Sequence, residues 1–226
     1  PSRLVGSEMC IRDSPITYGA TGLPDGLSID NSTGAISGTP TTAGRYEVVI
    51  SADDGVSGPN EIEITWEVFS TCSALDQEAE DAIIVGTKFV VGVDTAASND
   101  AYVHAPEGVG NASFGYAHQM RFCYDVAQAG DFRLKGWVYA PNGHSDGFFV
   151  TVDNTPSSGY LWDVTKNTVY AADYVSDRTG DDPVEVSLPA GRHVVAVHLR
   201  DDGTRLDRLL LEEFGGQSAT HRNRAR

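Results

Sequence analysis

The sequence predicts an all-β protein made of two consecutive β-sandwiches. Short apolar or alternating runs, such as residues 46–50, 62–68, 148–152 and 194–199, have the length and period of strands. Turn signals rich in the 24 glycines and 10 prolines separate these runs at intervals of roughly 8 to 12 residues, which is typical of sandwiches. No amphipathic stretch of helix length competes with them. A compositional seam at residues 70–73 separates two series of strands, and we expect the domain boundary there.

Composition excludes several classes of protein. The 226 residues include 40% hydrophobic side chains, enough for a core, but no apolar run approaches the roughly 18 residues of a membrane span. The 32 acidic residues outnumber the 16 basic ones, and a net charge of −16 argues against binding to nucleic acid. Only three bases are lysine, while aspartates are spread along the chain, which favours an extracellular or cell-surface location.

The two ends of the chain carry no fold signal. Residues 1–14 have neither the apolar centre nor the small-residue cleavage site of a signal peptide. They resemble translated sequencing-adapter readthrough at the end of a metagenomic reading frame, which implies that Cys10 is not native and that the protein extends further upstream. Residues 215–226 are polar, contain three arginines and have no periodicity, so we expect a disordered tail.

The first module, residues 15–69, is dense in turns. The segments LPDG, 31–34 and 38–40 each predict a turn, so only short strands fit between them. The run 45–53 then places Tyr46, Val48 and Ile50 on one face, and residues 61–68 give an antiparallel partner. The stretch GLPDGLSIDNSTGAISGTPTTAGRYEVVISADDG resembles the Ig-like, dystroglycan-type cadherin-like domain of bacterial surface proteins. Only the later strands of that truncated β-sandwich are present, which implies a poorly stable unit without a catalytic site.

The second module, residues 72–214, has acidic residues near both ends. Glu78 and Glu80 share one face if the opening segment is a strand, and two like charges on one face require a cation or an arginine between them. Near the C-terminus, Asp207 lies among apolar residues at the start of the last predicted strand. First and last strands of a sandwich are commonly neighbours, so we expect these three carboxylates to lie close together.

Three segments of the second module carry a family resemblance. The E-x-E, the central DGFFVTVDN and the closing PAGRHVVAVHLRDDGTRLDRLLLEEF resemble carbohydrate-binding modules of families 6 and 35, whose fold is the galactose-binding-like jelly roll. The resemblance implies a structural calcium held by Glu78, Glu80 and Asp207. The alternative is that the two glutamates pair with Arg205 or Arg208.

A sugar site needs a flat apolar surface and a few polar groups. Trp137 lies in an alternating run and is expected in the core. Trp162 and Tyr170 lie in the turn-rich stretch 154–176, where the family tends to place its platform aromatic, so we expect them to bind the ligand; the alternative is packing between strands. The polar candidates at the same rim are Asn142, His144, Asp146 and Arg205.

One early turn departs from the family pattern. Many members have a Gly-Gly pair where this chain has residues 97–103, and the Asn99-Asp100 pair still predicts a turn. Nothing in this segment indicates whether Tyr102 faces a ligand or the core.

The three cysteines do not have the spacing of a zinc site. Cys72 and Cys123 lie at the edges of predicted strands in the same module. They form either a disulfide in an oxidising compartment or two buried thiols.

No catalytic motif is present: the chain lacks G-x-S-x-G, H-E-x-x-H and a P-loop. We therefore expect that this chain is not an enzyme. Its second module is expected to be monomeric, to be stabilised by calcium and to bind a polysaccharide or glycan. The chain would be part of a larger secreted or surface bacterial protein. It would be accessory to a glycoside hydrolase or lyase. The alternative is a structural or adhesive stalk without glycan binding, belonging to a surface adhesin.

Overall fold

The computed structural model describes residues 15–69, 72, 75–178 and 180–215. The segment expected to derive from an adapter, Cys10 included, and all but the first residue of the expected tail lie outside the described residues. The chain divides into two compact units, Pro1–Ser70 and Thr71–Arg226, and each is described by itself. Secondary structure is almost entirely strand, as predicted, and no helix among the described residues is long and apolar enough to cross a membrane.

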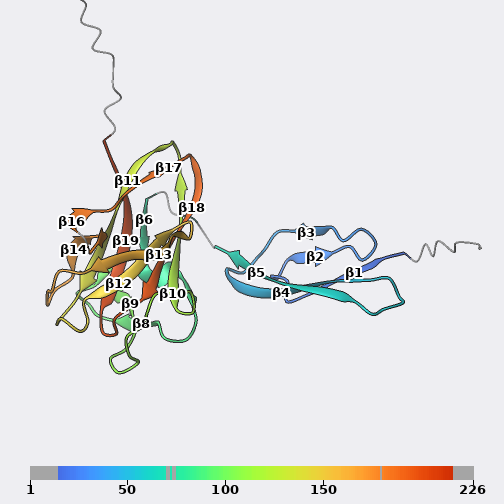
Figure 1. Ribbon diagram of the computed structural model, residues 1–226, viewed down its shortest axis with the longest axis horizontal. Coiled ribbons are helices and arrows are strands. Elements are labelled where there is room, and N and C mark those ends of the chain that lie inside the picture. Colours follow the sequence, from blue (N-terminus) through green and yellow to red (C-terminus); the bar gives the residue numbers. More distant parts are fainter. Residues whose placement is uncertain (1–14, 70–71, 73–74, 179, 216–226) are drawn as a thin grey trace, which may run out of the picture. The chain divides into compact units, whose positions relative to one another are not determined.

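The first unit contains one three-stranded antiparallel sheet and a small hairpin (Figure 1). The sheet has the order β1-β4-β5, with β1 at Thr17–Thr21, β4 at Gly44–Asp53 and β5 at Asn60–Val68. The hairpin joins β2, Leu27–Ile29, to β3, Ile36–Gly38. The predicted pairing of the two long strands is confirmed, because Tyr46, Val48 and Ile50 lie opposite Trp66, Ile64 and Ile62.

This first unit has little core. Val48 and Pro24 are its only buried apolar side chains among the described residues, and Ile62, on the same face as Val48, retains 60% of its exposure. Burial of apolar area is the main favourable term in folding. The unit therefore has little of that stabilisation within residues 15–69.

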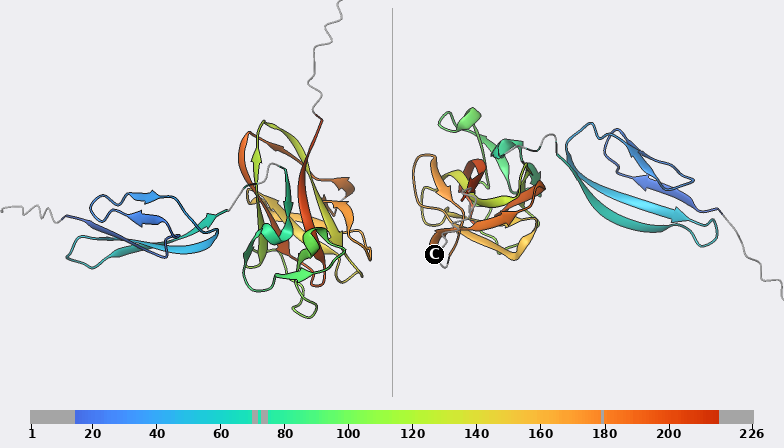
Figure 2. Two further views of the ribbon diagram at one scale, coloured as in Figure 1. Left: turned by 180° about the vertical axis from the view of Figure 1, so that it is seen from behind. Right: turned by 90° about the horizontal axis from the view of Figure 1, so that it is seen from above.

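The second unit is a sandwich of two antiparallel sheets (Figures 1 and 2). The five-stranded sheet has the order β13-β12-β18-β10-β7. Its strands are β7 Ile83–Val85, β10 Gln119–Val126, β12 Gly147–Val152, β13 Thr155–Asp163 and β18 Gly191–Leu199. The predicted runs 148–152 and 194–199 are strands of this sheet.

The seven-stranded sheet carries the candidate sites. Its main path is β14-β11-β19-β9-β8, with β17 paired to β11 and β6 paired to β19. The strands are β6 Asp76–Glu78, β8 Val90–Val93, β9 Ala101–His104, β11 Gly130–Tyr139, β14 Ala171–Tyr174, β17 Glu185–Leu188 and β19 Arg205–Phe214. The remaining elements are the 3-10 turns η1 Ala79–Asp81 and η2 Ser98–Asp100 and the short strands β15 Ser176–Asp177 and β16 Gly180–Pro183. The first and last strands are neighbours, as predicted, since β6 pairs with β19.

Large apolar side chains from both sheets fill the space between them, which gives the jelly-roll unit one continuous core. The largest fully buried members are Trp162, Tyr124, Phe122, Phe148, Met120, Leu134, Leu206, Leu209 and Leu211. Tyr124 donates its hydroxyl hydrogen bond to the Leu209 carbonyl at 2.7 Å, so its polar atom is satisfied inside the core. Cys72 and Cys123 form a disulfide that links the chain just before β6 to β10.

Candidate functional site

Four side chains from three segments gather around one arginine on the seven-stranded sheet. Arg205 begins β19 and lies opposite His104 of β9 on one side and Tyr139 of β11 on the other. Its guanidinium carbon lies 4.5 Å from the Tyr139 ring centre and 4.8 Å from that of Tyr102. Tyr170 lies just before β14, and its ring centre is 5.8 Å from that of Tyr139 and 6.1 Å from that of Tyr102. We call these five residues the Arg205 cluster.

Two of the predicted ligand residues, Tyr170 and Arg205, are thus brought together. The sequence left open whether Tyr102 faces a ligand or the core, and His104 and Tyr139 were not predicted. Tyr139 ends an alternating strand, so its outward position follows from the strand period once Leu134 and Val138 are placed in the core. Tyr102 is 7% exposed, and its ring passes so close to Gly92 of β8 that a Cβ there would lie 2.4 Å from the ring. A glycine is therefore required opposite Tyr102.

The charges within the Arg205 cluster are balanced. Arg205 forms an ion pair with Asp94, with 3.1 Å between Nη1 and Oδ2. Burial lowers the pKa of His104, and the positive charge of Arg205 lowers it further, so the imidazole is neutral at pH 7. Burial raises the pKa of Tyr170 to about 12, so its hydroxyl stays protonated. The cluster together with Asp94 therefore has no net charge at neutral pH.

One polar atom in the cluster is poorly satisfied. The Tyr170 hydroxyl oxygen is buried and has no hydrogen bond of good geometry among the described residues, although the Arg205 guanidinium lies close enough to interact with it. A buried hydroxyl without a partner costs free energy. A ligand hydroxyl group would satisfy it.

The prediction that Trp162 is a binding platform is wrong. Residues 155–163 form strand β13 rather than a turn-rich loop, and Trp162 points inward, with no exposed surface. Its ring packs 5.7 Å from that of Phe148, and its Nε1 donates a hydrogen bond to Asp173 Oδ1 at 2.8 Å. The prediction for Trp137 is wrong in the opposite sense. It is half-buried on the outer face of β11, and the guanidinium of Arg208 stacks over it at 3.7 Å.

The loop that carries Asn142, His144 and Asp146 lies beside the loop before β14 but does not join the Arg205 cluster. Asn167 N donates to the Ala140 carbonyl at 2.9 Å, which fixes the two loops to each other. Asn142 Oδ1 accepts from the His144 backbone at 2.8 Å, so the amide holds the turn. Among the described residues, no hydrogen bond, ion pair or ring contact joins these three predicted ligand residues to Tyr170 or Arg205.

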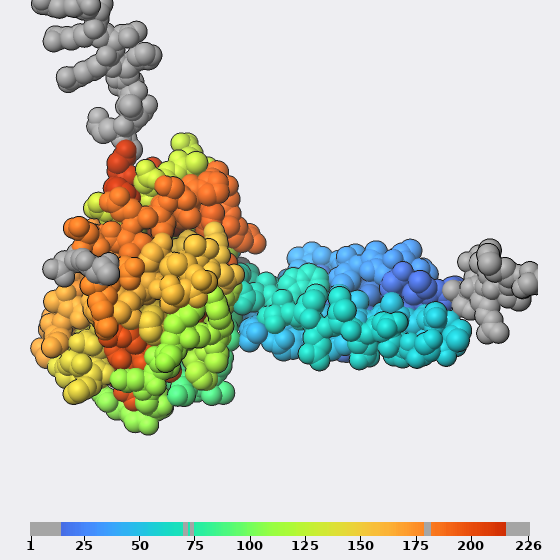
Figure 3. Space-filling view, in the orientation of Figure 1, coloured from blue at the N-terminus to red at the C-terminus, as the bar shows by residue number. Residues whose placement is uncertain are grey.

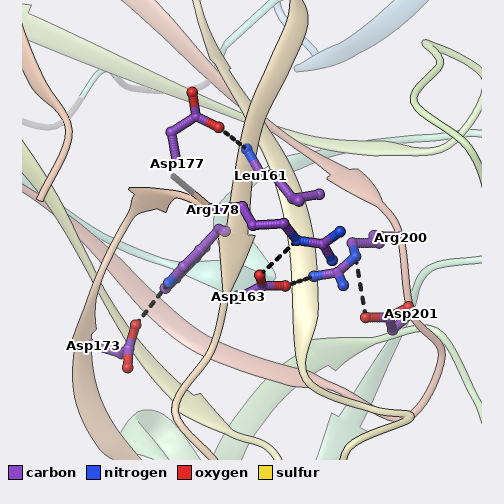
Figure 4. A network of polar contacts seen from close by, with 8 residues as sticks. Leu161, Asp163, Asp173, Asp177, Arg178, Arg200 and Asp201 are labelled. Atoms are coloured by element: carbon purple, nitrogen blue, oxygen red, sulfur yellow. Dashed lines mark hydrogen bonds and ion pairs between the residues drawn. The ribbon is translucent and has the colours of Figure 1, made fainter. Parts of the chain in front are cut away.

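Asp146 interacts electrostatically with Arg178 and Asp201, which belong to a separate ionic network. Figure 3 shows β13 and the segments that follow it, yellow to orange, on this side of the second unit. Figure 4 shows Asp163 between the guanidinium groups of Arg178 and Arg200. Burial raises the Asp163 pKa, but hydrogen bonds from these arginines hold it below its ordinary value. Each of these charges has a partner, so we assign the network to holding β13 against the end of β18.

The three predicted calcium ligands lie on neighbouring elements. Glu78 ends β6 and lies opposite Arg208 of β19, next to Asp207. The expectation that Glu78 and Glu80 share the face of a strand is wrong, because the strand stops at Glu78 and Glu80 lies in the 3-10 turn η1. Asp207 is the extra residue of a β-bulge: Trp137 pairs with Arg208, and Val138 pairs with Leu206. Bulges of this kind re-aim a side chain.

Ser98 of η2 connects two of these carboxylates. Its backbone N–H donates to Asp207 Oδ1 at 2.8 Å, and its hydroxyl donates to Glu78 Oε1 at 2.9 Å. The other oxygens of the two glutamates, Glu78 Oε2 and Glu80 Oε2, are buried without any hydrogen-bond partner. Burial, with the negative charge of Glu78 nearby, raises the pKa values of both Glu80 and Asp207.

The arginine alternative for these glutamates has little support in the geometry. Arg205 pairs with Asp94, and Arg208 pairs with Asp76 at 2.9 Å. Hard carboxylate oxygens without partners suit a calcium ion. The described residues nevertheless contain no group of three or more His, Cys, Asp and Glu side chains arranged to hold a metal ion as they stand. Binding would require the three carboxylates to close in and other oxygens, from backbone or water, to complete the coordination.

Comparisons with known proteins agree with this division of the chain. Residues 11–69 match the family described as "Putative Ig domain". No curated protein matches the chain at a significant level. Among solved structures, the GH26-CBM35 β-(1,4)-mannanase of Podospora anserina aligns with a TM-score of 0.50 and 16% identity. The alignment covers 64% of this chain and 28% of that one, and it shows the fold alone.

Two isolated modules give similar alignments. A family 35 carbohydrate-binding module from Clostridium thermocellum has a TM-score of 0.43 and 18% identity, over 59% of this chain and 93% of that one. The CBM35 from Paenibacillus barcinonensis has a TM-score of 0.43 and 16% identity, over 60% of this chain and 96% of that one.

Proposed function

We propose that the second unit is a non-catalytic carbohydrate-binding module that takes a neutral glycan at the Arg205 cluster. The observation that carries the proposal is the convergence of Tyr102 and Tyr139 on the Arg205 guanidinium, with Tyr170 packed against both rings and its hydroxyl left without a well-aligned hydrogen bond. Sugar rings are recognised by aromatic surfaces together with a few fixed polar groups. The cluster supplies both on one rigid sheet.

The charge of the site supports a neutral ligand. Arg205 is already paired with Asp94, so it presents hydrogen-bond donors rather than an uncompensated positive charge. The chain as a whole carries a net charge of −16, which repels polyanions at long range. Uronic and sulfated glycans are therefore second choices.

We further propose that Glu78, Glu80 and Asp207 hold a structural calcium. The two unpartnered glutamate oxygens support this assignment. When bound, calcium supplies a positive charge that offsets the mutual repulsion of the three carboxylates. The residues of this chain then fix the junction of η1, η2 and β19.

The module fits an extracellular or surface protein that is larger than this chain. A disulfide persists in an oxidising compartment, and the chain includes a region that matches an Ig family. One similar structure is a mannanase that carries a CBM35, and the present chain covers 28% of it. An accessory role beside a glycosidase or lyase follows as a proposal for the whole protein.

Glycan-array binding of the whole chain, followed by titration calorimetry of the selected glycans, tests the function. Binding that Tyr170→Ala and Arg205→Ala both weaken supports it, with Tyr116→Ala as a control for an exposed aromatic remote from the cluster. If no glycan binds the folded chain, the alternative of a structural or adhesive stalk replaces the proposal.

A further inference from the structure

One short loop connects the carboxylates around Asp207 to the Arg205 cluster. Residues 94–100 run from the end of β8 through η2 to the start of β9. At one end of the loop, Asp94 pairs with Arg205 at 3.1 Å. Near the other end, Ser98 donates to both Glu78 and Asp207. Tyr102 follows the loop directly in β9.

The loop is closed by its own hydrogen bonds. Asp94 N donates to the Asp100 carbonyl at 3.0 Å, and Ala97 N donates to the Asp94 carbonyl at 2.9 Å. Asp94 Oδ1 accepts from Ala96 N at 3.0 Å, so one carboxylate oxygen holds the loop and the other holds Arg205. Asn99 and Asp100 have left-handed backbones, with φ of 50° and 59°. A ring closed in this way transmits a displacement of Ser98 to Asp94.

A cation would displace Ser98. As they stand, Glu78, Glu80 and Asp207 are not gathered as a metal site. To share one ion they must approach each other, and Ser98 is hydrogen-bonded to two of the three.

We infer that loop 94–100 couples the two sites, so that a divalent cation at Glu78, Glu80 and Asp207 shifts Asp94, Arg205 and Tyr102 and thereby changes the affinity of the Arg205 cluster for its ligand. Asp94 and Ser98 are positioning residues in this inference, which rests on the cation and glycan sites of the proposed function. Linkage is reciprocal, so glycan and cation each change the affinity for the other by the same factor. A coupling of the usual size changes affinity about fivefold or more.

The direct test uses calcium alone as the probe on the whole chain, followed by NMR. The Arg205 Nε–Hε signal and the Tyr102 and Tyr170 ring signals should shift with the same midpoint as the Glu78 and Glu80 amides. Asp94→Asn should leave that amide midpoint in place and remove the Arg205 response, because the neutral amide can still accept from Ala96 N but no longer forms the ion pair. Asp125→Asn, which removes an exposed pair with Arg192 on the other sheet, is the matched control and should change neither response.

Two results overturn the inference: shifts confined to Glu78, Glu80 and Asp207, or no response to calcium at all. A second arm separates it from the glycan proposal by titrating mannohexaose, xylohexaose and cellohexaose in calcium and in EDTA. Equal affinity in the two buffers rejects the coupling and keeps glycan binding. If the Arg205 Nε–Hε signal responds to calcium but neither the array nor these three sugars show binding, the coupling is supported and the proposed glycan function is rejected.

Discussion

Trp162 donates its one polar hydrogen to Asp173 Oδ1 at 2.8 Å, although the indole has no exposed surface. The carboxylate lies on β14 of the seven-stranded sheet, while Trp162 lies on β13 of the five-stranded sheet. The bond therefore ties the two layers together beside the core, and Asp173 Oδ2 also accepts from Thr165 N at 3.1 Å.

Trp162→Ala should destabilise the second unit by about 3 to 5 kcal/mol, the usual loss when a large core side chain is truncated. Trp162→Phe should cost less, because it keeps most of the packing against Phe148 and loses the hydrogen bond to Asp173. Chemical denaturation followed by circular dichroism measures both. Trp137→Ala is the matched control on the half-buried outer face, and a loss there as large as that for Trp162 would contradict the assignment.

Tyr170→Ala should weaken glycan binding about tenfold, or roughly 1.4 kcal/mol, with a small change in stability. Tyr170→Phe separates the hydroxyl from the ring. If the hydroxyl binds the ligand, Tyr170→Phe should lower the affinity for glycan and leave the stability unchanged or slightly higher, since it removes a buried oxygen without a well-aligned hydrogen bond. Calorimetry and thermal unfolding on the same samples distinguish the two roles, and equal affinity of Tyr170→Phe and the parent chain would exclude the hydroxyl from the site.

Calcium should raise the melting temperature of the second unit, because an ion held only by the folded state stabilises that state. The double change Glu78→Gln and Glu80→Gln should abolish the rise. Differential scanning calorimetry in calcium and in EDTA makes the comparison, with Glu61→Gln and Glu63→Gln in the first unit as a control pair. Identical melting curves in the two buffers would remove calcium from the proposal.

The same carboxylates predict a pH dependence in EDTA. Burial raises the folded-state pKa values of Glu80 and Asp207, so between the unfolded and folded pKa values the folded state binds more protons. Their contribution to stability therefore falls as pH rises through that window and stays low above it. Glu80→Gln should gain stability over the parent chain as pH rises from about 4 to 7, measured by urea denaturation, and calcium should remove that gain. A difference between the two proteins that does not vary with pH would contradict the mechanism.

Replacing Cys72 and Cys123 by alanine should destabilise the second unit by up to about 4 kcal/mol, the chain-entropy value for a closed loop of 51 residues. Urea denaturation of the double variant measures the loss. A change below about 0.5 kcal/mol would mean that the denatured chain gains little freedom when the link is cut.

The sequence predicted the strands and the meeting of the two chain ends because both follow from local periodicity and from a common rule of sandwich topology. Residues 132–139 and 148–152 alternate between a core face and an outer face, so their strands were found. The pairing of Glu78 beside Asp207 followed from the pairing of first and last strands.

Each misplaced residue has its own physical cause. In β13, Tyr160, Leu161 and Trp162 are all apolar, so alternation gives no sign of which face is inside. Tyr102 depends on Gly92 in the neighbouring strand, and that contact is visible only when the register is known. Glu80 left the expected strand because η1 begins one residue after Glu78, with Ala79 fully buried between the two glutamates.

The bulge at Asp207 has a consequence for recognising distant relatives of this chain. Leu206, Leu209 and Leu211 all point into the core, yet the first two are three positions apart, which strict alternation forbids. A pattern search that assumes a period of two loses phase at Asp207 and assigns one half of β19 to the wrong face. A search for the motif Leu-Asp-x-Leu-x-Leu allows for this shift. It would find chains in which one inserted acidic residue is left unpaired in the sheet while the core positions before and after it are kept.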